Sequence, residues 1–187
     1  PGTIHKTVSA ILKTRPELAG RLGIHTHNDR GLATANTLAA LEAGCDLVQG
    51  TVNGLGERCG NAKLLEVIPI LMSETEYRNQ FESSITENTL ATRFPALRHL
   101  VYRLANLRPR PDDPFYGEDA FATKAGIHAS AVVKGGADLY EHSRPALFGQ
   151  ATRIRMSRQG GLSNLRAVLT QMDAPFDGRD EALSRLY

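Results

Sequence analysis

Cysteine is scarce in this sequence and tryptophan is absent. The two cysteines, Cys45 and Cys59, cannot form a disulfide framework, and they lack the spacing of a zinc finger. Because no signal sequence is recognisable either, we expect a protein of the reducing cytoplasm. No apolar run approaches the roughly 20 residues that a membrane-spanning helix needs, so we expect no membrane partner.

Neither sign of charge dominates the chain. The 22 Lys and Arg residues are nearly balanced by 20 Asp and Glu, which leaves a formal net charge of +2. A nucleic-acid-binding protein usually carries a clustered basic surface. The basic run RLANLRPRP, at 103–111, has no aromatic residues within it, and we interpret it as a solvated linker. We therefore expect no nucleic-acid partner.

The size and hydropathy are those of a globular chain. The 187 residues suit one domain, or one domain with an appendage, and 41% of them are hydrophobic. The first residues, PGTIHK, lack an initiator Met, and the last, DEALSRLY, have a helical pattern. We expect the sequence to be a piece of a longer protein.

The first 75 residues alternate between helical and extended patterns. Helices are predicted at 4–12, 31–44 and 62–71, with short strands at 21–27 and 46–52, and Pro69 is expected to bend or break the third helix. This order predicts parallel strands and an α/β fold. Polar residues follow both strands, at the end where βα barrels and doubly wound sheets place their chemistry. Two strands cannot close a barrel of eight.

The rest of the chain has a different character. A helix is predicted at 95–107, with Leu97, Leu100, Val101 and Leu104 on one face, and the proline-rich RPRPDDPFYGED at 108–119 is interpreted as a linker. Further predictions are a helix at 120–136, a strand at 152–157 and a helix at 163–172. We expect three divisions, at 1–75, 76–119 and 120–187.

His25 and His27 are the first candidate site. Side chains two residues apart on a strand point the same way, so both imidazoles could bind one divalent ion. The adjacent Asn28 and Asp29 could orient them, as polar neighbours of metal ligands commonly do. Many pairs with this spacing are surface accidents, and that alternative stays open.

A glycine-rich segment, NGLGERCGN at 53–61, is the second candidate. Three glycines let its backbone approach a ligand closely. Asn53, Glu57, Arg58 and Asn61 supply polar groups, and backbone amides ahead of the next helix could receive an anion. The alternative is a turn whose Asn61 caps that helix.

His128 is the third candidate. It shares an apolar helical face with Phe121, Ala125 and Val132, where a histidine is more often a packed core residue than a catalyst. Tyr140 could supply a hydroxyl group nearby. The sequence contains no nucleophile elbow, phosphate-binding P-loop or His-Glu-x-x-His motif.

Three separated blocks carry a resemblance that no single one would establish. GIHTHNDRGLATANTLAALEAG, VQGTVNGLGERCGN and AFATKAGIHASAV together resemble the 2-isopropylmalate, homocitrate and citramalate synthase family. LYEH and FGQATRIRMS are most similar to the citramalate branch. The resemblance implies the C-terminal part of a (β/α)8 TIM barrel, holding the last two strands within 1–75. It implies that mainly helical subdomains follow, with the linker in 76–119 and a second α+β subdomain carrying His128 in 120–187.

The resemblance also implies an activity. It is that of an acyltransferase that condenses acetyl-CoA with a 2-oxo acid, most simply pyruvate to give citramalate, in branched-chain amino-acid biosynthesis. It implies a homodimer and a divalent ion, which could be Zn, Mg or Mn. Alternatives are 2-isopropylmalate or homocitrate synthesis, a related metal-dependent lyase or aldolase, and a non-catalytic homologue.

Residue roles follow from the matched positions. The resemblance implies that metal is bound by His25, His27 and Asn61, and that His128 and Tyr140 are catalytic. It places a third group near acyl-CoA or in support of the glycine-rich segment, namely Asn28, Asp29, Asn53, Glu57 and Arg58.

The sequence departs from the family pattern in places. Thr123 stands where His is usual, Ala125 where Gly is usual, and Gly160 and Leu162 where a Ser-Gly-Arg pattern is typical. These changes favour the non-catalytic alternative. The Asp ligand of the family's first barrel strand also lies outside this chain, so we expect the 187 residues alone to be inactive.

Overall fold

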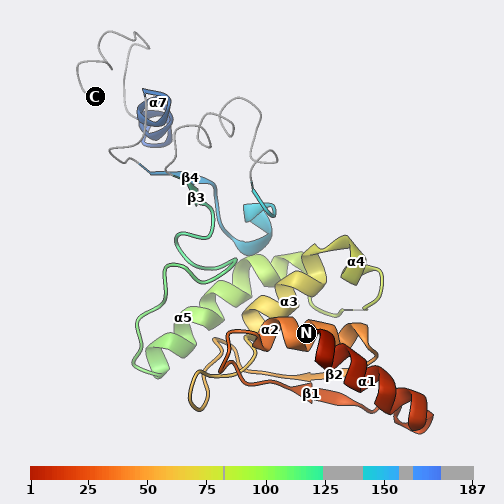
Figure 1. Cartoon of the computed structure of the whole chain (residues 1–187). Coiled ribbons are helices and arrows are strands. Elements are labelled where there is room, and N and C mark those ends of the chain that lie inside the picture. The colour runs from red at the N-terminus through yellow and green to blue at the C-terminus, as the bar shows by residue number, and fades with distance from the viewer. Residues whose placement is uncertain (82, 124–140, 156–161, 174–187) are drawn as a thin grey trace. The chain divides into compact units, whose positions relative to one another are not determined.

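The computed structural model describes residues 1–81, 83–123, 141–155 and 162–173. The chain divides into two compact units (Figure 1). Unit 1 contains residues 1–84 and 96–108, and unit 2 contains residues 85–95 and those from 109 onward.

Unit 1 has the predicted helix–strand alternation. Helix α1 (Gly2–Thr14) precedes strand β1 (Gly23–His25), and helix α2 (Ala33–Glu42) leads to strand β2 (Leu47–Gln49). The strands pair in parallel, with Ile24 opposite Val48, and both helices run alongside them in Figure 1. The prediction of parallel strands in an α/β unit is confirmed.

The core of unit 1 lies between the two helices and one face of the strands. Val8, Ala40 and Cys45 are buried there, and the partly buried side chains around them are Ile4, Leu12, Leu22, Ile24 and Ala43. Gly44 ends the second helix at φ 105°, and a β-carbon there would lie 2.7 Å from Leu12 Cδ1. The turn between α2 and β2 therefore needs a glycine.

Helix α3 (Leu64–Ser73) runs through Pro69 without a break. Pro69 is fully buried, together with Leu65 and Val67. Proline removes one backbone hydrogen bond from a helix, but apolar burial favours keeping the residue in place. Of the two predicted outcomes, a break at Pro69 is wrong, and a bend there stays a prediction.

Tyr77 joins the short helix α4 (Thr75–Arg78) to α2. Its hydroxyl donates a hydrogen bond to Glu42 Oε1. Desolvation, and then this hydrogen bond to a carboxylate, raise the pKa of Tyr77 to about 12. The folded chain therefore favours the neutral phenol.

We expect the stability contributed by Tyr77 to be present below pH 10 and to be lost as the pH rises from about 10 to about 12. The difference in free energy of unfolding between the wild type and Tyr77→Phe should shrink over that range, as urea denaturation would measure. Absorbance at 295 nm should show that the substitution removes a late tyrosinate step. Loss of an ordinary step near pH 10 would contradict the assignment.

Helix α5 (Phe94–Leu104) exposes the face that its leucines define. Leu97, Leu100 and Leu104 are 36%, 41% and 76% exposed, whereas Arg98 is 3% exposed and Tyr102 is buried. The Arg98 guanidinium carbon lies 5.2 Å from the centroid of the Tyr102 ring, close enough for a cation–π contact. The helix was predicted correctly, but the leucine face is not its buried face in unit 1.

Unit 2 is built around aromatic side chains. Phe148 is fully buried in the helical turn η4 (Pro145–Phe148), and its ring lies 4.8 Å from that of Phe115. Tyr116 is also buried, so the second half of the predicted linker is packed. The other elements of unit 2 are a π-helical turn, η2 (Thr89–Arg93), the parallel strands β3 (Ala122–Thr123) and β4 (Arg153–Ile154), and helix α7 (Leu162–Gln171).

One helix prediction in unit 2 is wrong at its start, and another is confirmed. The helix predicted from 120 begins instead as a turn and strand β3, and its remainder, including Ala125 and His128, lies outside the described residues. Helix α7 begins at Leu162, one residue before the predicted start.

Within the described ranges, no helix has the length and apolar character needed to cross a membrane.

Candidate metal site and its glycine-rich loop

His25 and His27 lie at the carboxyl end of β1. Their ring centroids are 5.1 Å apart and the rings are almost perpendicular. Thr26, between them, faces α2, where its hydroxyl donates to Ala33 O at 3.1 Å and lies 2.9 Å from Thr37 Oγ1. Because Thr26 is anchored on the buried side, the two imidazoles share the opposite side.

The loop from Asn53 to Asn61 brings a third polar side chain to this end of the strand. Asn61 forms an antiparallel bridge with His27, and its N–H donates to Gly54 O at 3.0 Å. Gly60 has φ 87°, and a β-carbon there would lie 2.0 Å from Gly54 O. The loop can therefore close in this way only with glycine at position 60.

The two bridged residues each carry one buried side-chain polar atom without a hydrogen-bond partner among the described residues. These atoms are His27 Nδ1 and Asn61 Oδ1. Unsatisfied buried polar atoms are uncommon in folded proteins and often mark a site for an ion, a water or a ligand. Gly56 packs directly on Asn61, because a β-carbon there would lie 2.6 Å from Asn61 Nδ2.

The donor set suits a divalent ion but is incomplete. An imidazole nitrogen and an amide oxygen are both established metal ligands. His25 would add a second imidazole. In the described part of the chain, no three His, Cys, Asp or Glu side chains gather into a metal-binding group. The residues present therefore fit part of a metal shell, namely two imidazoles and one amide.

Asn28 and Asn53 stabilise the backbone around the site. Asn28 Oδ1 accepts a hydrogen bond from Ala33 N at 3.1 Å, at the start of α2, and Asn28 N donates to Gly60 O at 2.8 Å. Asn53 is buried and donates through Nδ2 to Arg98 O at 3.1 Å, which fixes the start of the loop on α5. Both residues were expected near acyl-CoA or in support of the loop, and these contacts favour the second role.

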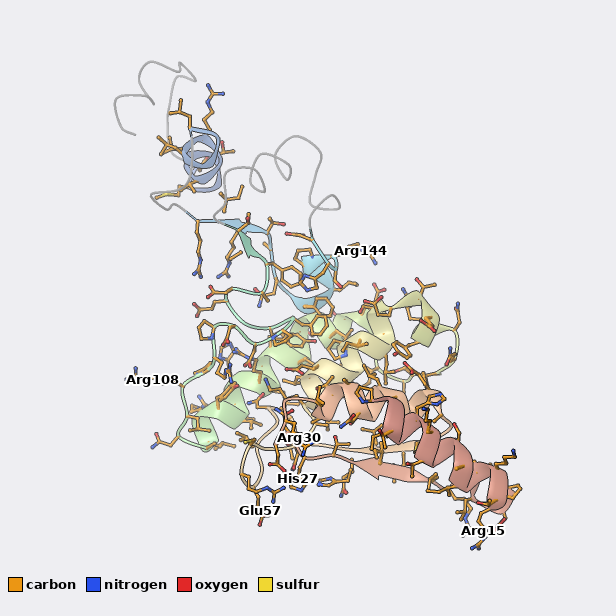
Figure 2. All side chains as sticks on the ribbon, viewed as in Figure 1. Arg15, His27, Arg30, Glu57, Arg108 and Arg144 are labelled. Atoms are coloured by element: carbon orange, nitrogen blue, oxygen red, sulfur yellow. The ribbon has the colours of Figure 1, made fainter. Side chains whose placement is uncertain are left out.

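Asp29 and Arg58 form a bidentate ion pair across the loop. Arg58 Nε donates to Asp29 Oδ1 at 3.0 Å, and Arg58 Nη2 donates to Asp29 Oδ2 at 2.8 Å. These hydrogen bonds and the charge of Arg58 hold the pKa of Asp29 below its usual value. Glu57 is 85% exposed and lies 3.7 Å from Arg58, and Figure 2 shows it at the outer end of the loop.

A second ion pair near the same end was missed in the sequence. Lys63 Nζ lies 3.0 Å from Glu66 Oε1, and Glu66 Oε2 accepts a hydrogen bond from Thr34 at 2.9 Å. The pair connects the starts of α2 and α3. The sequence feature that could have revealed this pair is the three-residue spacing of Lys63 and Glu66, which is typical of neighbours on a helix.

The other candidate residues fall in or beside unit 2. His128 and Tyr140 lie outside the described residues, as do Ala125 and Gly160. Thr123 is buried and lines a cavity of about 250 Å³ with Phe121, Glu141 and His142. The structure therefore brings His25, His27 and Asn61 together but leaves the two expected catalytic residues unplaced.

Two family models match the chain. The first is HMGL-like and covers residues 1–100, which is more than half of the 187 residues. The second is the homocitrate synthase post-HMGL domain-like model, which covers residues 115–185.

Individual relatives agree with these matches. An (R)-citramalate synthase from Geobacter sulfurreducens is 39% identical over 92% of this chain and 31% of its own length. One from Synechocystis is 46% identical over 88% of this chain and 30% of its own length. A 2-isopropylmalate synthase from Methanocaldococcus jannaschii is 35% identical over 94% of this chain and 33% of its own length. The chain thus spans about a third of the length of these relatives.

Proposed function

The chain belongs to the HMGL-like family, and on that basis we propose that it is part of an acyltransferase that condenses acetyl-CoA with a 2-oxo acid. Relatives that are 39% and 46% identical to the chain are named as (R)-citramalate synthases, so we propose pyruvate as the 2-oxo acid and citramalate as the product. The structural observation that carries the proposal is the pair of bare atoms, His27 Nδ1 and Asn61 Oδ1, at the carboxyl end of β1.

We propose that β1 and β2 are the last two strands of a (β/α)8 barrel whose other strands lie elsewhere in the full protein. Parallel sheets are normally covered on both faces. Here Gly23, His25, Leu47 and Gln49 are exposed on the face away from the helices, and Leu47 is 66% exposed. In this proposal, the barrel part is 1–75, the helical subdomain and linker are 76–119, and the subdomain with His128 is 120–187.

We propose that His25, His27 and Asn61 hold a divalent ion, which could be Zn, Mg or Mn, with further ligands from the rest of the protein. When bound, such an ion supplies a Lewis acid for the carbonyl group of the 2-oxo acid. The backbone bridge between His27 and Asn61 holds the two positions side by side, so little movement of the backbone is needed for both side chains to act as ligands.

We propose that the subdomain supplies the hydrolytic step of the reaction, and that the base for the methyl proton comes from the rest of the protein. The acetyl thioester must lose a methyl proton before it can attack the carbonyl carbon, and the condensed thioester must later be hydrolysed. We propose that His128 activates the water for hydrolysis and that Tyr140 donates a hydrogen bond beside it. We also propose a homodimer, located in the cytoplasm and active in branched-chain amino-acid biosynthesis.

A second candidate is 2-isopropylmalate synthesis, because relatives with that name are 34% and 35% identical over 99% and 94% of the chain. The two reactions differ only in the 2-oxo acid, and this chain contains two of the proposed eight strands. The choice between pyruvate and 2-oxoisovalerate therefore depends on side chains outside it.

The full-length protein tests the proposal directly. Supplied with acetyl-CoA, pyruvate and Mn²⁺ or Zn²⁺, it should release free CoA thiol, measured with a thiol reagent, and form citramalate, identified by mass spectrometry. The 187-residue chain should release none. Higher kcat/KM with 2-oxoisovalerate would favour the second candidate, and no thiol release with any 2-oxo acid would overturn both.

A further inference from the structure

We propose that Asp29 and Arg58 are positioning residues, which together form a latch that holds the glycine-rich loop closed so that Asn61 lies beside His27. This inference rests on the proposed function and adds to it the two residues that hold a proposed metal ligand in position. It assigns Arg58 to the loop and not to contact with acyl-CoA.

The pairing continues a short ladder between two chain segments. The backbone bridge between His27 and Asn61 consists of two hydrogen bonds, from Ala62 N to Thr26 O at 3.1 Å and from Asn28 N to Gly60 O at 2.8 Å. Asp29 and Arg58 make the third contact in the same direction, through side chains. The ion pair is thus the outermost contact between the loop and the segment that carries both histidines.

The geometry of the pair is specific. Two near-parallel N–H···O bonds of 3.0 and 2.8 Å join the guanidinium edge to the carboxylate, which fixes direction as well as distance. Arg58 has φ 55°, in the left-handed region that a non-glycine residue rarely adopts. An arginine held in that conformation by a bidentate partner indicates that the side chain is needed at this position.

The pair also leaves few donors of Arg58 for a substrate. Nε and Nη2 are used by Asp29, and Nη1 lies 3.7 Å from Glu57 Oε2. This arrangement predicts that the latch and the acyl-CoA affinity can be separated by mutation.

Hydrogen exchange on the 187-residue chain tests the latch without any metal or substrate. In Asp29→Asn, the amides of Asn28 and Asn61 should exchange about 1.5- to fivefold faster, the range expected when an exposed ion pair is lost. The amide of Asp46, which donates to Leu22 O at 2.9 Å beside the strands, should keep its rate. Arg58→Gln should give the same result, and the double variant should add nothing further.

Asp112→Asn is the matched control. Asp112 accepts a similar bidentate pair from Arg110, at 3.2 and 2.9 Å, in unit 2. Its substitution removes an equivalent exposed carboxylate and should leave the Asn28 and Asn61 amides unchanged. Unchanged exchange in both Asp29→Asn and Arg58→Gln would overturn the latch, whatever the enzyme assay shows.

The full-length protein separates positioning from substrate contact. Asp29→Asn and Arg58→Gln should each lower the affinity for Mn²⁺, measured by calorimetry, by a factor of about 10. The two variants should also lower kcat by about the same factor. The KM for acetyl-CoA should stay within twofold of the wild type. A raised KM in Arg58→Gln alone would show substrate contact and contradict the latch. If no thiol is released by the wild type, the proposed function fails and the exchange result still decides the latch.

Discussion

Gly60→Ala is expected to open the glycine-rich loop and to disable the metal site. The added β-carbon would lie 2.0 Å from Gly54 O, and the residue would have to keep φ 87°. The combined overpacking and backbone strain should lower the free energy of unfolding by about 3 kcal/mol unless the loop moves. Because Asn61 is the next residue, any such movement displaces its side-chain amide from His27.

In the full-length protein, a displacement of about 1 Å at a ligand should reduce kcat by about 10²-fold. In the 187-residue chain, the backbone N–H of Asn61, which donates to Gly54 O, should lose its protection from hydrogen exchange. Gly20→Ala is the control, since Gly20 has φ 72° but nothing within 4 Å of an added β-carbon. It should cost about 1 to 2 kcal/mol of stability with no effect on the loop. Normal Asn61 exchange in Gly60→Ala would refute the close packing.

His27→Ala is expected to remove metal binding from the full-length protein. Loss of groups that merely orient a metal ligand costs about 10- to 100-fold, so loss of a ligand should reduce thiol release by more than about 100-fold. Metal content, measured by inductively coupled plasma mass spectrometry, should fall well below that of the wild type. His5→Ala, on the exposed surface of α1, should change neither quantity.

The same substitution should have little effect on the metal-free 187-residue chain. His27 Nδ1 is buried without a partner among the described residues, and removing such an atom offsets the loss of ring contacts. We expect the free energy of unfolding to change by less than about 1 kcal/mol. A large loss of stability would show that His27 is a packing residue, and retained metal in the full-length variant would exclude it as a ligand.

Local periodicity predicted the part of the fold that local forces determine. The helix–strand order of residues 1–49 and the shared side of His25 and His27 both follow from the spacing of side chains. Helix α5 shows the limit of that reasoning. Its leucines define an apolar face, but Arg98 and Tyr102 are buried instead, since unit 1 packs against the opposite side. Periodicity reports which side chains share a face and cannot tell which face finds a partner.

Long-range pairing is the other part that the sequence did not predict. Asp29 and Arg58 are 29 residues apart, and each was identified only as a polar residue near a ligand or loop. Their pairing depends on how the loop closes, which Gly54 and Gly60 decide through their positive φ angles. Phe115 and Tyr116 were likewise assigned to a linker because nearby prolines dominate the local pattern, whereas a distant Phe148 determines their burial.

The bridge between His27 and Asn61 has an evolutionary consequence. It is made by the backbone, so neither side chain is needed to keep the two positions adjacent. Selection on ligand chemistry can therefore act at 27 and 61 with little penalty in folding, while Gly54 and Gly60 carry the folding constraint. A substitution at either position should therefore change what the site can bind more than it changes how the loop folds.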